Sequence, residues 1–493
     1  MEYSRKTTLL MAGLMLASSA SAYAADLSLQ EAIDMALAQN TALKVTQKGE
    51  ITAEETLHSA RGKNGVSVSA SDSLRTRKNS GSDRSSSNSL RLEGSLPLYS
   101  GGANEAAIKS GELGLSAARL KTERERENLK LSVIQAYYDA LEAKKTVGVR
   151  QETVDKYQEH LTNVSQLYAA GSKARIDVIN SSVELSNARQ DLIKSENSYE
   201  VSLAKLRNYL NMSRTEPLSL TTDFAYAPFS EPMEDAITYA YGHRLDLLAD
   251  TYAYEQKQQS LKEAKAGYKP TLDLSMGLGH SNAFEPAGDS SNDVSAGVSV
   301  KWNIFDGGVT RAKVKSARND VDVAKLTLDK DKEDIDLALR EAYYNMREAE
   351  KRFNSTGDAI KQAEENYYIA REKYRAGEGL MLDITDAQTS LSTARLNYIS
   401  AQYDYARYKA AVENAMGEPL TDGERAAAAT MTSETSAEQE KKLAEAIPEQ
   451  KIVSPADAKP AADVKTRAQG AAASTSASSE AVVRELAGEG TER

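Results

Sequence analysis

The pentapeptide Leu98-Tyr99-Ser100-Gly101-Gly102 returns later in the chain as Ile304-Phe305-Asp306-Gly307-Gly308. The two copies are 206 residues apart, since 304 minus 98 is 206. The same offset relates three further pairs, which are Ala136-Tyr137-Tyr138 with Ala342-Tyr343-Tyr344, Tyr168-Ala169-Ala170-Gly171 with Tyr374-Arg375-Ala376-Gly377, and Ala188-Arg189 with Ala394-Arg395. One offset kept over about 90 residues indicates a tandem duplication. The fold is therefore expected to contain two copies of one unit.

Two segments of alternating apolar and polar residues precede each pentapeptide. In the first of them, Val66, Val68 and Ala70 alternate with Ser67 and Ser69. A period of two residues gives a strand one apolar and one polar face. We predict strands over 66–75, 88–98, 271–280 and 293–305. The glycine pairs Gly101-Gly102 and Gly307-Gly308 permit the turn from strand into helix that should follow.

These strands have two interpretations. The first is a soluble sheet whose apolar face packs on the helices. The second is a set of membrane strands, because the polar face carries the Ser, Arg, Glu and Asp that a water-filled lumen needs, and Trp302 lies near a strand end. Four strands cannot close a barrel on their own. The second interpretation therefore requires several chains, since open sheet edges do not occur in lipid.

Long helices follow each strand pair. Between Gly102 and Gly171 there is no proline, and apolar residues such as Leu129, Val133 and Ala136 step by four and three along a heptad seam. We predict helices over 28–61, 103–170 and 175–210 in the first repeat, and over 234–266, 309–376 and 380–416 in the second. At 1.5 Å per residue the longest helices span about 100 Å. Such rods must pack against neighbouring rods, because one rod cannot form a globular core.

The segments outside the repeats have their own signatures. Residues 1–24 resemble a secretory signal peptide, with Arg5 and Lys6, a short apolar run and the small-residue site Ala22-Tyr23-Ala24. The repeats are expected at 25–210 and 233–417, joined by a proline-containing linker at 211–232. Residues 418–493 are rich in Ala, Ser, Thr and Glu. Such a composition buries too little apolar surface to fold alone, so we expect a mostly disordered tail.

Composition argues against several classes of function. The chain has 493 residues and a net charge of −11, which disfavours a nucleic-acid partner. It contains no cysteine and only four histidines, none close to another in sequence. Thiolate chemistry is therefore excluded, and neither a metal site nor a cofactor is expected. No phosphate-binding loop or activated nucleophile is evident, so we predict that the protein is not an enzyme.

The order of these features, all present twice, resembles the TolC family of outer-membrane efflux and secretion channels. The resemblance covers about residues 26–418. It implies a mainly α fold of long coiled-coil hairpins with four strands per chain, three chains forming a twelve-stranded outer-membrane β-barrel and a helical periplasmic tunnel. It also implies a homotrimer, contact with outer-membrane lipid, and recruitment by a periplasmic adaptor and an inner-membrane ABC or proton-driven transporter.

The resemblance also implies that the helix–helix turns form a closed periplasmic entrance. Asp383 and Asp386 match the family's acidic ring, which could be blocked by cations. The alternative is that they are ordinary acidic residues in the first turns of a helix. Tyr374 and Asp177 match a polar link that holds the entrance shut. Gly171, Gly377 and Gly379 mark the turns, and Gly379 stands where the family has a basic residue, for which Lys173 or Arg175 could substitute.

Two functions follow from the sequence. The first is a passive exit duct of a tripartite efflux pump or type I secretion system, located in the outer membrane of a Gram-negative type of cell envelope. The alternative is a periplasmic coiled-coil scaffold or adaptor without a pore. The alternating strands distinguish them, because a scaffold has no use for a sheet with one apolar and one polar face.

Overall fold

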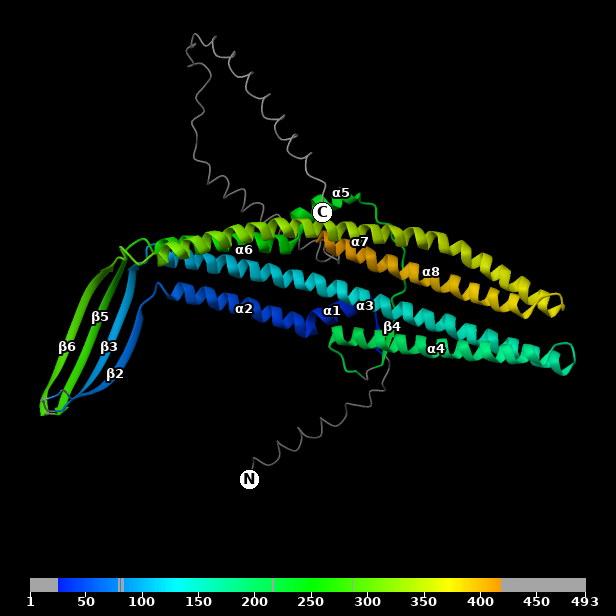
Figure 1. The fold of residues 1–493 in the computed structure, drawn as a ribbon, viewed down its shortest axis with the longest axis horizontal. Helices are drawn as coiled ribbons and strands as arrows, with labels where there is room; N and C mark the ends of the chain where they lie inside the picture. Colours follow the sequence, from blue (N-terminus) through cyan, green and yellow to red (C-terminus); the bar gives the residue numbers. More distant parts are fainter. Residues whose placement is uncertain (1–24, 79, 81–83, 215–216, 286, 418–493) are drawn as a thin grey trace, which may run out of the picture. The chain divides into compact units, whose positions relative to one another are not determined.

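The computed structural model describes residues 25–417, apart from 79, 81–83, 215–216 and 286 (Figure 1). All of these residues belong to the first of two units of the chain, Met1–Ala427. The expected signal peptide at 1–24 and the expected tail at 418–493 lie outside the described residues.

The duplication appears as two sets of elements in the same order. The first set comprises α1 (Leu29–Gln39), α2 (Thr41–Gly62), β2 (Ser67–Arg77), β3 (Ser85–Tyr99), α3 (Ala103–Ala169) and α4 (Arg175–Leu210). The second comprises α5 (Met233–His243), α6 (Leu245–Ala266), β5 (Thr271–Glu285), β6 (Ala287–Lys301), α7 (Val309–Arg375) and α8 (Met381–Met416). The short strands β1 (Ala25–Leu27) and β4 (Leu218–Leu220) form a separate parallel pair.

The helices form two hairpins, α3 with α4 and α7 with α8, which lie side by side (Figure 1). The shorter α2 and α6 pack along the part of α3 and α7 that is nearer the sheet (Figure 1). Apolar burial is divided among separate clusters along the rods, the largest centred on Val133, Tyr137 and Leu206. None of the described helices combines the length and the apolar composition needed to cross a membrane.

The four longer strands form one antiparallel sheet in the order β2-β3-β5-β6. The register places Ala70, Leu92, Leu278 and Val294 in one row across the sheet. The next row holds Ser71, Arg91, Gly279 and Asp293 on the opposite face. The alternation predicted from sequence is therefore a property of the whole sheet, with one apolar and one polar face.

The helices cover neither face of this sheet. Every residue of β2 is exposed, and on β6 Val294 is 81% exposed. The sheet also leaves the outer edges of β2 and β6 without a partner among the described residues. The soluble interpretation, in which the apolar face packs on helices, is therefore wrong for this chain.

Two expected helices are each divided in two. The helix predicted over 28–61 is α1 and α2, because Asn40 leaves the helical conformation and caps α2. Its Oδ1 accepts hydrogen bonds from the amides of Ala42 and Leu43 at 2.9 and 3.2 Å. The helix predicted over 234–266 is likewise α5 and α6, divided at Arg244.

The strands also differ from expectation at their ends. The strand predicted over 293–305 ends at Lys301, and the indole of Trp302 donates instead to the carbonyl of Tyr268 at 3.0 Å. The polar stretch between the predicted strands 271–280 and 293–305 continues β5 and β6. Polar cross-strand pairs support this extension, since His280 contacts Asn292 and Ser281 contacts Ser291, each at 2.7 Å.

A buried tyrosine ties the first long helix to the β1–β4 pair. The side chain of Tyr137 is fully buried, and its hydroxyl donates to the carbonyl of Leu27 at 2.8 Å. The same hydroxyl accepts from the amide of Thr222 at 3.0 Å. Its equivalent in the second repeat, Tyr343, is half-buried, and its hydroxyl donates to the carbonyl of Glu231 at 3.3 Å and accepts from Arg347 at 3.1 Å. The two repeats thus use one tyrosine position with unequal burial and different partners.

We expect Tyr137→Phe to lower the free energy of unfolding by about 1–3 kcal/mol, because the part-buried amide of Thr222 loses its acceptor and the carbonyl of Leu27 loses its donor. Tyr343→Phe is the matched control and should cost less. Thermal unfolding followed by circular dichroism measures both. Equal midpoints for the two variants and the wild type would contradict this role of Tyr137.

Candidate functional site

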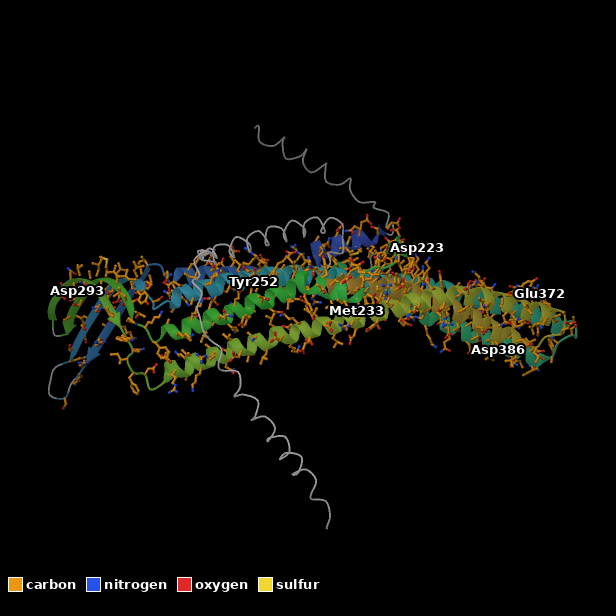
Figure 2. All side chains as sticks on the ribbon, turned by 90° about the horizontal axis from the view of Figure 1, so that it is seen from above. Asp223, Met233, Tyr252, Asp293, Glu372 and Asp386 are labelled. Carbon is orange, nitrogen blue, oxygen red and sulfur yellow. The ribbon has the colours of Figure 1, made fainter. Side chains whose placement is uncertain are left out.

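The two helix–helix turns lie together at the end of the hairpins that is remote from the sheet (Figure 1). Asp386 and Glu372 mark this end, and Asp293 marks the sheet (Figure 2). Val164 of α3, Tyr374 of α7 and Ile384 of α8 belong to one small buried cluster here. The turns of both repeats therefore meet around a shared core.

Each turn follows a glycine in the left-handed region, with φ of 77° at Gly171 and 83° at Gly377. The amide of Ser172 donates to the carbonyl of Leu167 at 2.9 Å, and that of Glu378 donates to Lys373 at 3.0 Å. These backbone bonds close the ends of α3 and α7 in the way typical of glycine-terminated helices. The backbone of the turns is thus fixed by its own hydrogen bonds.

An aspartate then caps the helix that leaves each turn. Oδ2 of Asp177 accepts from the amide of Ala174 at 3.3 Å, and Oδ2 of Asp383 accepts from the amide of Leu380 at 3.0 Å. Asp386 lies one turn further along α8, and its carboxylate makes no hydrogen bond or ion pair within the described residues. Asp383 and Asp386 are both exposed. Asp383 is therefore a first-turn helix residue that still presents its charge to solvent.

Tyr374 is the centre of the contacts between the turns. Its side chain is only 4% exposed. The Nζ of Lys173, in the first turn, lies 4.0 Å from the centroid of its ring, and the ring of His160 on α3 lies 5.4 Å away. The hydroxyl of Tyr374 and Nε2 of His160 are both buried without a hydrogen-bond partner within the described residues.

The structure brings Tyr374 near Asp177 without joining them by a hydrogen bond. Burial raises the pKa of Tyr374, and the nearby Asp177 carboxylate raises it further. Burial lowers the pKa of His160, while Asp177 and Glu159 oppose this shift. Within this chain, Tyr374 and Asp177 thus interact electrostatically and are not hydrogen-bonded to each other.

Steric crowding explains why position 379 is a glycine. A Cβ at this position would lie 2.9 Å from the backbone nitrogen of Tyr374, closer than ordinary contacts allow. A basic side chain therefore does not fit here. Of the two residues proposed to replace that basic side chain, Lys173 contacts the second turn, because its ammonium lies over the ring of Tyr374.

On the side of the turns that is nearer the sheet, a series of polar contacts joins α3 of the first hairpin to the second hairpin. Arg395 of α8 pairs with Glu152 and, at 2.8 Å, with Glu364. Thr153 and Ser392 form a buried hydroxyl contact at 3.0 Å. Arg375 at the end of α7 pairs with Glu159 at 3.8 Å.

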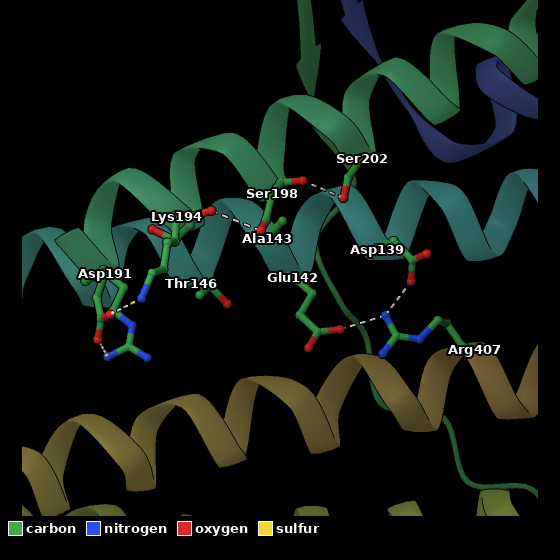
Figure 3. Close-up of a pocket in the computed structure, with 11 residues that line it drawn as sticks. Asp139, Glu142, Ala143, Thr146, Asp191, Lys194, Ser198, Ser202 and Arg407 are labelled. Carbon is green, nitrogen blue, oxygen red and sulfur yellow. Dashed lines mark hydrogen bonds and ion pairs between the residues drawn. The ribbon is translucent and has the colours of Figure 1, made fainter.

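Further from the turns, a groove of about 450 Å³ lies between α3, α4 and α8 (Figure 3). Arg407 crosses it to reach Asp139 at 2.8 Å and Glu142 at 2.7 Å (Figure 3). Burial raises the pKa of Glu142, and Arg407 opposes that shift. The two hairpins of one protomer are therefore held together by ion pairs as well as by apolar packing.

Sequence reasoning placed some of these residues and missed others. Asp177 at the start of α4, Tyr374 at the end of α7, and Asp383 and Asp386 at the start of α8 lie at one end of the hairpins, as expected of a common site. The glycines of the strand-to-helix turns lie at the opposite end, each with positive φ: Gly101, Gly102, Gly307 and Gly308. His160 was missed as a site residue, although its spacing from Tyr157 and Val164 places it on the buried face of α3.

Within the described part of the chain, no three His, Asp or Glu side chains lie close enough together to hold a metal ion.

Comparison with known proteins places this architecture. A model of the family described as "Outer membrane efflux protein" matches residues 32–212 and 236–418. The chain is 20% identical to Outer membrane protein TolC of Escherichia coli over 307 residues, which cover 59% of this chain and 62% of that protein. It is also 20% identical to Outer membrane efflux protein BepC of Brucella suis over 397 residues, covering 80% and 86% of the two chains.

The fold matches a solved channel. The CmeC outer membrane channel of Campylobacter jejuni superimposes with a TM-score of 0.71 at 18% identity, covering 82% of this chain and 88% of that one. These matches confirm the predicted mainly α fold of duplicated long hairpins with four sheet strands, the predicted location in the outer membrane, and the prediction that the protein is not an enzyme. The chain therefore belongs to the outer membrane efflux protein family, whose members are channel proteins.

Proposed function

We propose that this chain is the passive outer-membrane exit duct of an export system. Three copies combine their sheets into one twelve-stranded barrel, and their helices continue it as a tunnel through the periplasm. A periplasmic adaptor and an inner-membrane transporter recruit and open the duct. Cargo then leaves through it by diffusion, with energy supplied by the transporter, as efflux substrate or as a secreted polypeptide.

The observation that carries this proposal is the uncovered sheet. Its edge strands β2 and β6 present unpaired backbone groups, which cost several kcal/mol each in lipid. Pairing β2 of one copy with β6 of the next removes both edges at once, and a closed ring of copies leaves none. The apolar row then faces lipid, and the row with Arg91 and Asp293 faces water.

The dimensions of the apolar face suit an outer membrane. It runs from Val294 on β6 to Trp302 just beyond the end of that strand, a stretch of about nine residues, which is the length of a tilted strand that crosses a membrane. Beyond Val294 the row on this face becomes Asp72, Leu90, His280 and Asn292. At the other end Trp302 is 58% exposed, as expected for an aromatic residue at the membrane interface.

The helices also expose apolar surfaces that neighbouring copies of the chain would cover. One side of α4 and one side of α7 expose apolar side chains at helical spacing. These are Ile176, Ile179, Val183, Ile193 and Val201 on α4, and Val323, Leu326, Leu337 and Tyr344 on α7. Exposed apolar side chains that recur along one side of a helix are typical of protein interfaces. Neighbouring copies would cover them, whereas a lone scaffold protein would leave them in water.

The turns would form the narrow periplasmic entrance of this duct. Three copies bring the exposed Asp383 and Asp386 into one acidic ring. Tyr374, Asp177 and Lys173 hold the second hairpin against the first in the resting state, through the packing around the tyrosine ring. Opening requires these contacts to separate.

We expect the double variant Asp383→Asn with Asp386→Asn to weaken block by divalent and trivalent cations on the order of tenfold or more. Asparagine keeps an oxygen that caps α8, so the change removes charge with little effect on the helix. Asp358→Asn, at an exposed position on α7, is the control. Block constants are measured in planar bilayers, and an unchanged constant in the double variant would place the acidic ring elsewhere.

We expect Tyr374→Ala to raise single-channel conductance by about twofold or more, because it removes the ring on which Lys173 and His160 pack. Tyr374→Phe keeps that ring and should have the smaller effect. Bilayer recordings of both variants separate the ring from the hydroxyl. Equal conductance in the wild type and Tyr374→Ala would show that Tyr374 does not hold the entrance closed.

A further inference from the structure

His160 occupies a place in the closed turns where an ordinary packing residue would be apolar. It lies on the buried face of α3, between Tyr157 and Val164, and its ring packs on that of Tyr374. Its Nε2 is buried without a hydrogen-bond partner within the described residues. The hydroxyl of Tyr374 is buried without a hydrogen-bond partner within the described residues as well. Two buried polar groups that satisfy nothing are costly, so such a pair calls for a role beyond packing.

We propose that His160 is a proton-sensitive gating residue, whose protonation loosens the closed turns and favours the open entrance. The inference rests on the proposed exit duct, since it assigns a signal to the gate of that duct. The signal is acidification of the periplasm, the compartment in which the turns would lie.

Charged side chains near His160 come from α3, α4, α7 and the first turn. Glu159 lies beside it on α3, and Asp177 lies opposite on α4. Lys173 of the first turn places its ammonium over the same tyrosine ring, 4.0 Å from the centroid. Arg375 of α7 lies near enough to pair with Glu159 at 3.8 Å. From α8 the nearest side chains of the shared cluster are apolar, namely Ile384 and Ala387.

The direction of the effect follows from burial. In the closed turns desolvation holds the pKa of His160 below its ordinary value of 6.5, although Asp177 and Glu159 act against the shift. When α3 separates from Tyr374, the imidazole meets water and its pKa returns to the ordinary value. The open form thus binds more protons, and the closed form loses stability as pH falls below the ordinary value. Each unit of difference in pKa shifts the equilibrium by up to about tenfold per protomer.

Carboxyl groups titrate over a different pH range from imidazole. The reference pKa of an aspartate side chain is about 4, well below that of histidine. A change in conductance between about pH 7.5 and about pH 5.5 therefore reports mainly on histidine. The remaining histidines are away from the turns, and His58 on α2 is exposed, which makes it a matched control.

The test is the ratio of single-channel conductance at about pH 5.5 to that at about pH 7.5. We expect a ratio above one for the wild type and for His58→Gln. We expect the ratio to fall towards one for His160→Gln, which does not titrate, and for His160→Phe, which keeps an aromatic ring against Tyr374 and guards against misfolding of the first variant. A ratio of one in the wild type, or a wild-type ratio retained in both His160 variants, overturns the proposal.

A second measurement does not need a pore. Histidine labelled with ¹³C gives four resonances in the intact protein, and His160→Gln identifies the one from this site. We expect this resonance to titrate below pH 6.5. If the wild type conducts no ions at any pH, the exit duct is wrong, and the titration alone decides the state of His160. A pKa at or above the ordinary value would overturn the gating role whatever the recordings show.

Discussion

Unpaired backbone hydrogen-bonding groups at the two edges of the sheet constrain everything else in this protein. The sheet stands clear of the helices, exposes both of its faces and ends in the free strands β2 and β6. Neither free edge is tolerated in lipid, and a long free edge in water invites uncontrolled pairing. Association of several copies satisfies both edges, and it also supplies the neighbours that the apolar sides of α4 and α7 lack. One requirement at the sheet therefore accounts for surfaces along the whole length of the helices.

The duplication explains how one chain supplies both a rigid part and a part that moves. Each repeat gives a strand pair, a long helix and a returning helix, yet the two are not equal. The tyrosine of the first repeat, Tyr137, is fully buried and bonded to the β1–β4 region, whereas Tyr343 is only half-buried. At the turns the asymmetry is reversed, since the buried tyrosine is Tyr374 of the second repeat, and Tyr168 of the first is 46% exposed. In the proposed duct the first hairpin is fixed near its middle, and the second is held at its tip by contacts that can separate.

Much of this architecture was accessible from sequence because it depends on periodicity. Alternation located all four sheet strands, and heptad spacing with glycine ends located the long hairpins. The errors have physical reasons. Asn40 divides a helix without disturbing the apolar period, because its side chain replaces the backbone bonds that are lost. The stretch around His280 and Asn292 has the composition of a loop, yet its polar residues pair across strands. At the candidate site the carboxylates were found from the family's pattern, whereas His160 and the ion pairs of Arg395 and Arg407 depend on how two hairpins pack, which no local pattern encodes.

Closure of the sheet into a barrel depends most directly on how many copies of the chain form one particle. The protein lacking residues 1–24 is extracted from membranes, and the molar mass of its particles is measured by light scattering with the detergent contribution subtracted. We expect extraction to require detergent and each particle to contain three chains. A homogeneous particle of one chain, stable in buffer without detergent, would contradict it, because the free edges of the sheet would then be tolerated by a single copy.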